Sequence, residues 1–213
     1  MGSNIFIYQV AIAMKAILSS VYCGSIEYYT VLKNAEEVLI DSQEHYTKQT
    51  FRNRCEIYGA NGKLNLTIPL VRRGQRVPVY DAQIENSHGW RKLHWRSIES
   101  AYRSSPYFEF YEHHFISIFE KDHTHLFQLN QEIQNKIIQV LNLDVVVKET
   151  NSYEKEHPGY NDYRNTIHPK VAPKNKLADK RYIQVFESKY GFIPNLSILD
   201  LLFNEGPNTV SFL

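Results

Sequence analysis

Lys15-Ala16-Ile17-Leu18-Ser19-Ser20 and Glu37-Val38-Leu39-Ile40-Asp41 are the two apolar runs that decide the fold class of this 213-residue chain. Each has the length and the composition of a buried strand. Between them, Ser25 stands where it can cap a helix, and Glu27 favours the first turn of that helix. A strand, a helix and a second strand with short connections predict a right-handed unit with parallel strands. We therefore expect an α/β fold.

The spacing of apolar residues changes further along the chain. Asn61-Gly62 predicts a turn, and strands are expected over residues 63–71 and 79–84. From Trp90 onward the spacing is helical, and Val145-Val146-Val147 predicts one more short strand. The expected helix faces are Trp90, His94, Ile98 and Ala101, then Phe108, Tyr111, Phe115, Ile118 and Phe119, then Leu126, Leu129, Ile133, Ile137, Val140 and Leu141.

These elements predict an N-terminal βαβ-type mixed sheet with a mainly helical C-terminal half packed on it. Residues 1–13 are expected to form an extension, either frayed or laid down as an edge strand. Residues 14–213 form a single domain in this interpretation, β-rich over 14–86 and mainly helical over 87–213. A long polar loop is expected near residues 151–180, and such loops are often functional. Ser197 and Asp200 predict a capping box, and Gly206-Pro207 predicts the end of that helix.

Composition excludes several classes of function. The net charge of +1 gives no overall field for nucleic acid or an anionic membrane. Two cysteines make no disulfide framework, and no apolar run reaches the roughly 20 residues of a membrane span. No Lys or Arg precedes residue 14, so a secretory signal is not indicated and a cytoplasmic location is expected.

The nine histidines do not predict a metal site. His113-His114 and His123-Thr124-His125 fall in or beside helices, where adjacent residues face different ways. No Cys-x-x-Cys or His-Glu-x-x-His motif is present. We expect no metal, and the sequence identifies neither a cofactor nor an oligomeric state.

A basic stripe is expected if residues 46–54 are extended, because a period of two then places one set of side chains on one face. That set is Tyr46, Lys48, Thr50, Arg52 and Arg54. Three cations beside a tyrosine could hold a diphosphate and stack a base or a sugar, with Arg72, Arg73 and Arg76 adding from the next loop. The alternative is a solvated basic edge that limits strand pairing.

Polar residues at the ends of the first two strands are candidates for chemistry. Asp41 and His45 follow the second strand, at the edge where ligands of open α/β sheets collect. A His near a carboxylate can act as a general base at neutral pH. The alternative is an Asx-type turn with a surface His. Tyr22 lies in the loop before the first helix, whose N–H groups favour a phosphate or carboxylate, although ordinary capping explains the same residues.

Two further segments are candidates for the wall of a pocket. His94 and Trp95 begin a helix, and Trp95 is expected to face away from the Trp90 stripe, either as a sugar platform or against another helix. Asn204 and Glu205 end an apolar helix in a tight polar segment. They either line a pocket or simply stop the helix.

Four blocks of sequence carry a family resemblance. They are Lys48, Phe51, Asn53 and Arg54 downstream of Asp41, then Leu66-Thr67-Ile68-Pro69, then Trp90 to Tyr107 with His94, Trp95 and Tyr102, and finally Phe192 to Pro207. Together they make the chain, from about residue 14 to its end, resemble the WbqC-like protein family. One departure concerns a Gln-Pro-x-Tyr-x-Pro-Trp-type loop of many members, of which residues 19–25 keep only Tyr22.

The resemblance implies a transferase-like protein of bacterial surface-glycan biosynthesis, in O-antigen or capsule assembly. It implies transfer of an acyl or aminoacyl group to an amino-sugar nucleotide. Under this hypothesis we expect Asp41 or His45 to serve as base. The expected substrate-binding residues are Tyr22, Tyr46, Lys48, Arg52, Asn53, Arg54, His94, Trp95, Tyr102, Asn204 and Glu205. The alternative hypothesis is a non-catalytic binding or scaffold protein of the glycan machinery, in which these residues spread over a flat face.

Overall fold

The predicted parallel unit is present. The computed structural model describes residues 14–71, 76–174 and 180–213. Strands β1 (Lys15–Ser19) and β2 (Glu37–Asp41) pair in parallel along their whole length, and helix α1 (Ile26–Asn34) connects them. Ser25 caps α1, because its hydroxyl oxygen accepts a hydrogen bond from the Tyr28 N–H. The expected extension over residues 1–13 lies outside the described residues, as do Arg72 and Arg73.

Two strands from the second half of the chain complete the parallel sheet. Strand β5 (Val146–Glu149) pairs with β2, and β6 (Asn161–Asp162) pairs with β1, which gives the order β5-β2-β1-β6. The sequence does not predict β6, because this strand has two polar residues and lies inside the long loop. The free edge of β1 holds it in place, and the Tyr163 N–H extends the pairing by donating to the Ile17 carbonyl. All four strands therefore end at one carboxyl edge.

A hairpin forms the second sheet. Strands β3 (Arg54–Gly59) and β4 (Gly62–Thr67) are antiparallel, and residues 60–61 make the turn between them. The strand expected over residues 79–84 is wrong. Residues Val79–Asp81 form a 3-10 helix, η1, in which the Asp81 N–H donates to the Pro78 carbonyl. Pro78 fixes the backbone at the start of this turn, and only isolated bridges follow it.

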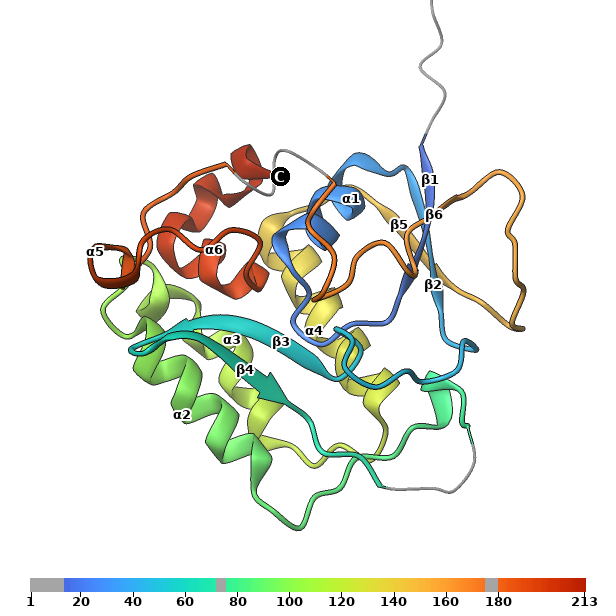
Figure 1. Cartoon of the computed structure of the whole chain (residues 1–213), viewed down its shortest axis with the longest axis horizontal. Coiled ribbons are helices and arrows are strands. Elements are labelled where there is room, and N and C mark those ends of the chain that lie inside the picture. The colour runs from blue at the N-terminus through green and yellow to red at the C-terminus, as the bar shows by residue number, and fades with distance from the viewer. Residues whose placement is uncertain (1–13, 72–75, 175–179) are drawn as a thin grey trace, which may run out of the picture.

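The helical half follows the predicted periodicity. Helices α2 (Trp90–Tyr102), α3 (Phe108–Glu120) and α4 (Leu126–Leu141) bury the expected faces, except that Val140 of α4 is only half-buried. Short α5 (Glu187–Tyr190), then α6 (Ile198–Glu205) and the 3-10 helix η3 (Gly206–Phe212) close the chain. Figure 1 shows the parallel sheet towards one end of the molecule and hairpin β3–β4 with α2 and α3 towards the other. The predicted α/β class, with a mainly helical second half, is confirmed.

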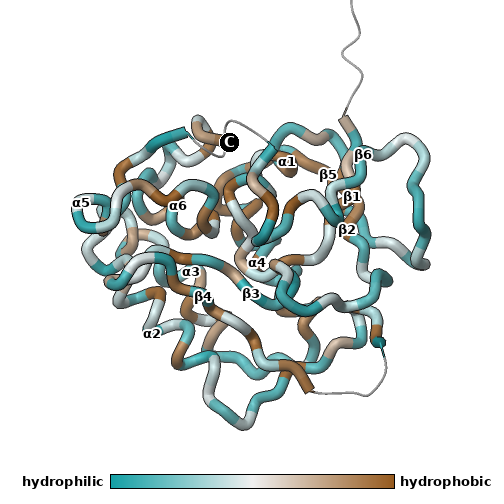
Figure 2. The backbone as a smooth tube through the Cα atoms, viewed as in Figure 1, coloured by the Kyte–Doolittle hydropathy of each residue, from teal (hydrophilic) through white to brown (hydrophobic). Residues whose placement is uncertain are grey.

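The interior is rich in aromatic residues. The largest fully buried side chains include Tyr22, Tyr28, Tyr29, Tyr58 and Tyr102. Hydrophobic residues lie along β1, β2 and β3, whereas the outer loops are mainly hydrophilic (Figure 2). Much of the high tyrosine content therefore builds the core. Within the described ranges, no helix combines the length and the hydropathy needed to cross a bilayer.

Candidate functional site

A buried polar network lies at the carboxyl edge of the parallel sheet. Asp41 ends β2 and is fully buried. One carboxylate oxygen accepts from the Gln43 and Glu44 N–H groups and from the Thr150 hydroxyl, and the other accepts from Arg164 at 2.7 Å. Four donors occupy this carboxylate, which leaves it poorly placed to take a proton from a substrate. Asp41 therefore holds the loops of this edge together, and the sequence-based expectation of a general base does not fit its geometry.

Arg164 joins the long loop to this network. Its guanidinium donates to Asp162, to Asp41 and to the carbonyls of Glu154 and Lys155. Hydrogen bonds to Asp162, and then to Asp41, raise the pKa of Arg164 above its ordinary value. Since carboxylates and carbonyls engage this cation from several sides, it acts as a structural ion and not as a ligand for substrate.

The expected basic stripe is wrong, because residues 48–53 form turns and bends and Gln49 has a φ of +60°. Arg52 is 5% exposed and makes a two-pronged ion pair with Glu44. It also donates to the Ser19 hydroxyl at 3.0 Å. Burial raises the pKa of Glu44, and the hydrogen bonds from Arg52 oppose this shift. Arg52 is thus a buried structural cation, while Lys48 and Arg54 remain open to other partners.

A cleft of about 980 Å³ opens between the 46–53 loop and the chain that follows β4. Tyr46, Lys48 and Asn53 line it, so the fold brings three of the predicted binding residues together. The Asn53 amide donates to the Ile68 carbonyl, which fixes one wall. Arg76 also lines the cleft, as the sequence suggested for this basic loop.

Cations from separate segments gather beside this cleft. Arg54 begins β3, is half-buried, and makes no side-chain hydrogen bond or ion pair with another residue of the described chain. Burial raises the pKa of Tyr46, and the nearby Arg54 and Arg52 oppose the shift. Burial lowers the pKa of His168, and then Lys170, Arg52 and Arg54 lower it further. Burial is the main cause of both shifts, and the smaller contributions of Arg54 place this cation near both Tyr46 and His168.

The long loop supplies part of this positive charge. Lys170 donates to the Gln49 side chain at 2.8 Å, which ties residues 163–171 to the 46–53 loop. The imidazole Nδ1 of His168 accepts the Lys170 N–H, so the neutral ring carries its proton on Nε2. Sequence reasoning missed Arg164, His168 and Lys170, because the loop has no periodicity. The long polar loop itself was the available signal.

Tyr22 and His94 form a buried pair behind the cleft. The Tyr22 hydroxyl and His94 Nδ1 lie 2.9 Å apart, and His94 also hydrogen-bonds the backbone of Thr67, which lines the cleft. Burial lowers the pKa of His94 to about 4, so this imidazole is neutral at physiological pH. With Tyr22 fully buried, the pair supports the wall from inside.

His45 does not pair with Asp41. Its side chain is exposed, and its ring centroid lies 6.3 Å from that of Tyr153 in the long loop. An isolated β-bridge pairs His45 with Pro78, and the Tyr46 N–H donates to the Val77 carbonyl. Neighbours on such an extended segment point to opposite sides. Tyr46 lines the cleft and His45 lies outside its lining.

Four predicted residues lie in the helical half, away from the cleft lining. Trp95 is half-buried against Phe108 and Phe119 of α3, which is the second of its two expected positions, packing on another helix. Tyr102 is buried and donates to Asp200. Near the end of α6, the Asn204 side-chain amide donates to the Asp200 backbone carbonyl. The Glu205 carboxylate accepts from the Asn208 side-chain amide. Within residues 14–71, 76–174 and 180–213, no group of three or more His, Cys, Asp or Glu side chains is arranged to hold a metal ion.

Comparisons with known proteins give one family match and one similar curated protein. The model of the WbqC-like protein family matches residues 20–165, which include the cleft loop, α2 and Arg164. The uncharacterized protein Rv1507c of Mycobacterium tuberculosis (strain ATCC 25618 / H37Rv) is 26% identical over 222 residues, which cover 93% of this chain and 96% of that protein. No solved structure matches the chain significantly.

Proposed function

Because the chain belongs to the WbqC-like protein family, we propose that it acts in bacterial surface-polysaccharide biosynthesis and binds a phosphate-bearing sugar precursor in the cleft. The proposed ligand is an amino-sugar nucleotide of O-antigen or capsule assembly, and the proposed location is the cytoplasm. The family name supports the pathway, and the charges around the cleft support the class of ligand.

The observation that carries the proposal is Arg54. A half-buried guanidinium without an acidic partner in the described chain has lost part of its hydration without gaining a counter-ion. Arginine offers a planar fork that suits phosphate oxygens, and lysine adds a point charge. Lys48 lines the cleft, whereas Arg54 follows Asn53 just outside the lining. His168 lies near enough to Arg54 for that cation to lower its pKa, and its Nε2–H is a further donor. A diphosphate beside Tyr46 would neutralise these cations and leave the tyrosine ring to contact a base or sugar.

The proposed reaction is acyl or aminoacyl transfer to the amine of the bound sugar. The amine nitrogen bonds the acyl carbon of an activated donor, the bond from that carbon to the leaving group breaks, and one proton passes from nitrogen to a base. His45 is the remaining sequence-based candidate for this base, since its side chain is exposed whereas Asp41 is saturated with donors. His45 lies outside the lining of the cleft, so the amine of the bound sugar would have to extend past Tyr46 to reach it.

Calorimetric titration with UDP-N-acetylglucosamine and with inorganic phosphate tests the binding step. We expect Arg54→Gln and Lys48→Gln each to weaken nucleotide-sugar binding by about tenfold or more, which is about 1.4 kcal/mol. Arg96→Gln and Lys92→Gln are matched controls, because both residues are exposed on α2. Added salt should weaken binding, since exposed charges are screened. Equal affinities in all four variants, or no binding at all, would overturn the cleft as a phosphate site.

A second experiment separates enzyme from scaffold. The protein is incubated with a UDP-amino sugar and acetyl-coenzyme A as a representative thioester donor, and mass spectrometry follows formation of the amide. Product that depends on His45 and Arg54 would support transfer. Binding without product across a panel of acyl and aminoacyl donors would favour the non-catalytic alternative, in which the cleft docks a precursor for another protein.

A further inference from the structure

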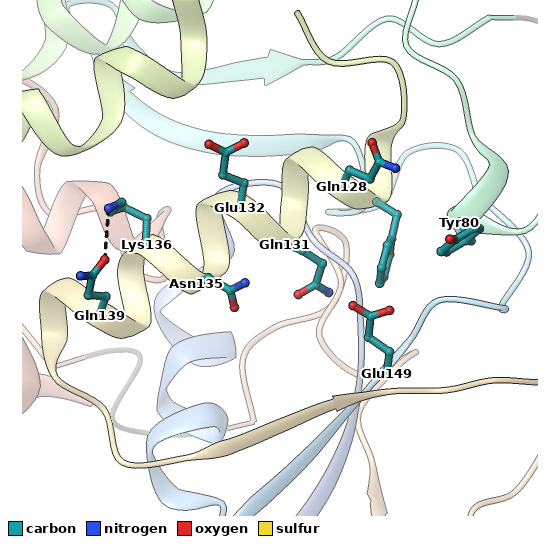
Figure 3. A pocket seen from close by; sticks show the side chains of 9 residues that line it. Tyr80, Gln128, Gln131, Glu132, Asn135, Lys136, Gln139 and Glu149 are labelled. Atoms are coloured by element: carbon teal, nitrogen blue, oxygen red, sulfur yellow. Dashed lines mark hydrogen bonds between the residues drawn. The ribbon is translucent and has the colours of Figure 1, made fainter. Parts of the chain in front are cut away.

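A second hollow lies between α4 and the end of β5, on residues that the proposed phosphate cleft does not use. It has a volume of about 640 Å³, within the range of small-molecule sites. Figure 3 shows the α4 side chains on one side and Glu149 of β5 on the other, with Tyr80 of η1 at one end. We name this hollow the amide groove, after Gln128, Gln131, Asn135 and Gln139 of its lining.

The amides of α4 share one face of that helix. Residues 128, 131, 135 and 139 are separated by three or four positions, so they stack along the groove. Each primary amide offers two donors and one acceptor oxygen. The face thus presents many neutral hydrogen-bonding groups to one ligand, in a place where a solvated helix would usually carry charges.

The side-chain amide of Gln131 is the strongest indication that the groove holds a ligand. Its Nε2 is buried and has no hydrogen-bond partner among the described residues. In Figure 3 this amide points toward Glu149, across the groove. A buried donor left unpaired is destabilising, and a ligand oxygen that accepts from it would recover part of that loss.

Charge and aromatic groups narrow the class of ligand. The charged residues of the described lining are Glu132, Glu149 and Lys136, so carboxylates outnumber cations and a phosphate is disfavoured. Tyr80 is 48% exposed, and its ring packs against the buried Phe127 ring, with 5.7 Å between the two ring centroids. An exposed aromatic face beside amides suits a ligand with one apolar face and a rim of hydroxyl groups.

We infer that the amide groove binds an uncharged saccharide. Sugar hydroxyl groups donate and accept at once, which matches the amides, and the C–H face of a pyranose ring matches Tyr80. Glu149 would accept from ligand hydroxyl groups at the far side. This inference is independent of the proposed function, because it uses none of the cationic residues beside the cleft.

Saturation-transfer difference NMR tests it, with glucose, galactose, N-acetylglucosamine and chitobiose as separate probes at millimolar concentration. We expect saturation to reach the ring protons of at least one probe. Tyr80→Ala and Gln131→Met should each reduce that signal at least fivefold, and proton NMR of each variant checks that it folds. Tyr190→Ala is the matched control, since Tyr190 is also half-exposed but lies on α5.

Further outcomes distinguish this site from the cleft. The double variant Lys48→Gln, Arg54→Gln should keep saccharide binding even if it loses nucleotide-sugar binding. Saccharide binding that survives Tyr80→Ala and Gln131→Met, or that disappears with the cleft variants, would overturn the amide groove. Binding of glucosamine without binding of any neutral probe would also overturn it, because an ammonium group held by Glu149 would then explain the site.

Discussion

The Arg164 guanidinium donates to the Asp41 carboxylate at 2.7 Å, and both side chains are buried. These residues are 123 positions apart. One ends β2 and the other follows β6, so the ion pair closes the carboxyl edge of the sheet with the long loop. The loop thereby keeps His168 and Lys170 beside the 46–53 segment, where the proposed phosphate site lies.

Arg164→Met should strongly destabilise the fold. Removing one partner leaves the Asp41 charge buried and uncompensated, which typically costs about 3–5 kcal/mol. Urea unfolding measures the loss. Arg103→Met is the matched control, because the Arg103 side chain is 45% exposed and its pairs with Glu99 and Glu112 should contribute under about 1 kcal/mol. Equal losses in the free energy of unfolding for the two variants would show that the buried ion pair stabilises the fold no more than the exposed pairs of Arg103.

Asp200 should make stability fall as pH rises. Burial raises its pKa to about 6 from an ordinary 3.8, against the hydrogen bonds from Tyr182, Tyr102 and Gln184. The folded state therefore binds this proton more tightly than the unfolded chain. The stability it contributes is complete below pH 3.8 and is lost as pH rises to about 6, by an amount on the order of 3 kcal/mol. Asp200→Asn should abolish this loss in urea unfolding measured from pH 4 to 7.

His94 should make stability fall as pH falls, over a pH range similar to that of Asp200. Burial lowers its pKa to about 4 from 6.5, so the unfolded chain binds the proton more tightly. Stability from neutral His94 is complete above pH 6.5 and is lost as pH falls towards 4. In His94→Gln the remaining Asp200 effect should appear as a steeper fall of stability with rising pH. An unchanged slope in the variant would contradict a buried, neutral imidazole.

Gly206→Ala should be among the most damaging single-methyl additions. Gly206 has a φ of +55°, and a Cβ atom there would lie 2.5 Å from Cδ1 of Tyr107. Strain and overpacking together predict a loss of about 3 kcal/mol. Gly159→Ala is the control: its φ of +85° imposes similar strain, but nothing lies within 4 Å of the added methyl group. A loss of about 1 kcal/mol is expected there in the same unfolding experiment.

Helix faces and the central parallel pair could be predicted from sequence alone. The periodicity of residues 90–141 predicted which side chains of α2 and α3 are buried, because an amphipathic helix has one apolar stripe whatever it packs on. The strand predicted over residues 79–84 is wrong, since the sequence pattern of a short apolar segment with flanking turns fits a strand and a 3-10 turn equally well.

The candidate site was less predictable, because long-range pairing decides which charges are free. Sequence could identify Arg52 and Arg54 as neighbouring cations but could not separate their roles. Glu44 neutralises Arg52 inside the protein, whereas Arg54 stays without a partner in the described chain. Likewise the sequence predicts Asp41 as a possible base. In the structure its carboxylate accepts from Arg164, which comes from a loop without periodicity.

The α/β class, the parallel β1–α1–β2 unit and the buried helix stripes follow from local hydrophobic spacing and capping, which can be read along the chain. Which polar groups are paired and which remain available depends instead on contacts between distant segments. Glu44 pairs with Arg52 across a turn, and Arg164 pairs with Asp41 from a distant segment. Local sequence carries little information about such contacts, because burial and charge pairing depend on where the whole chain folds.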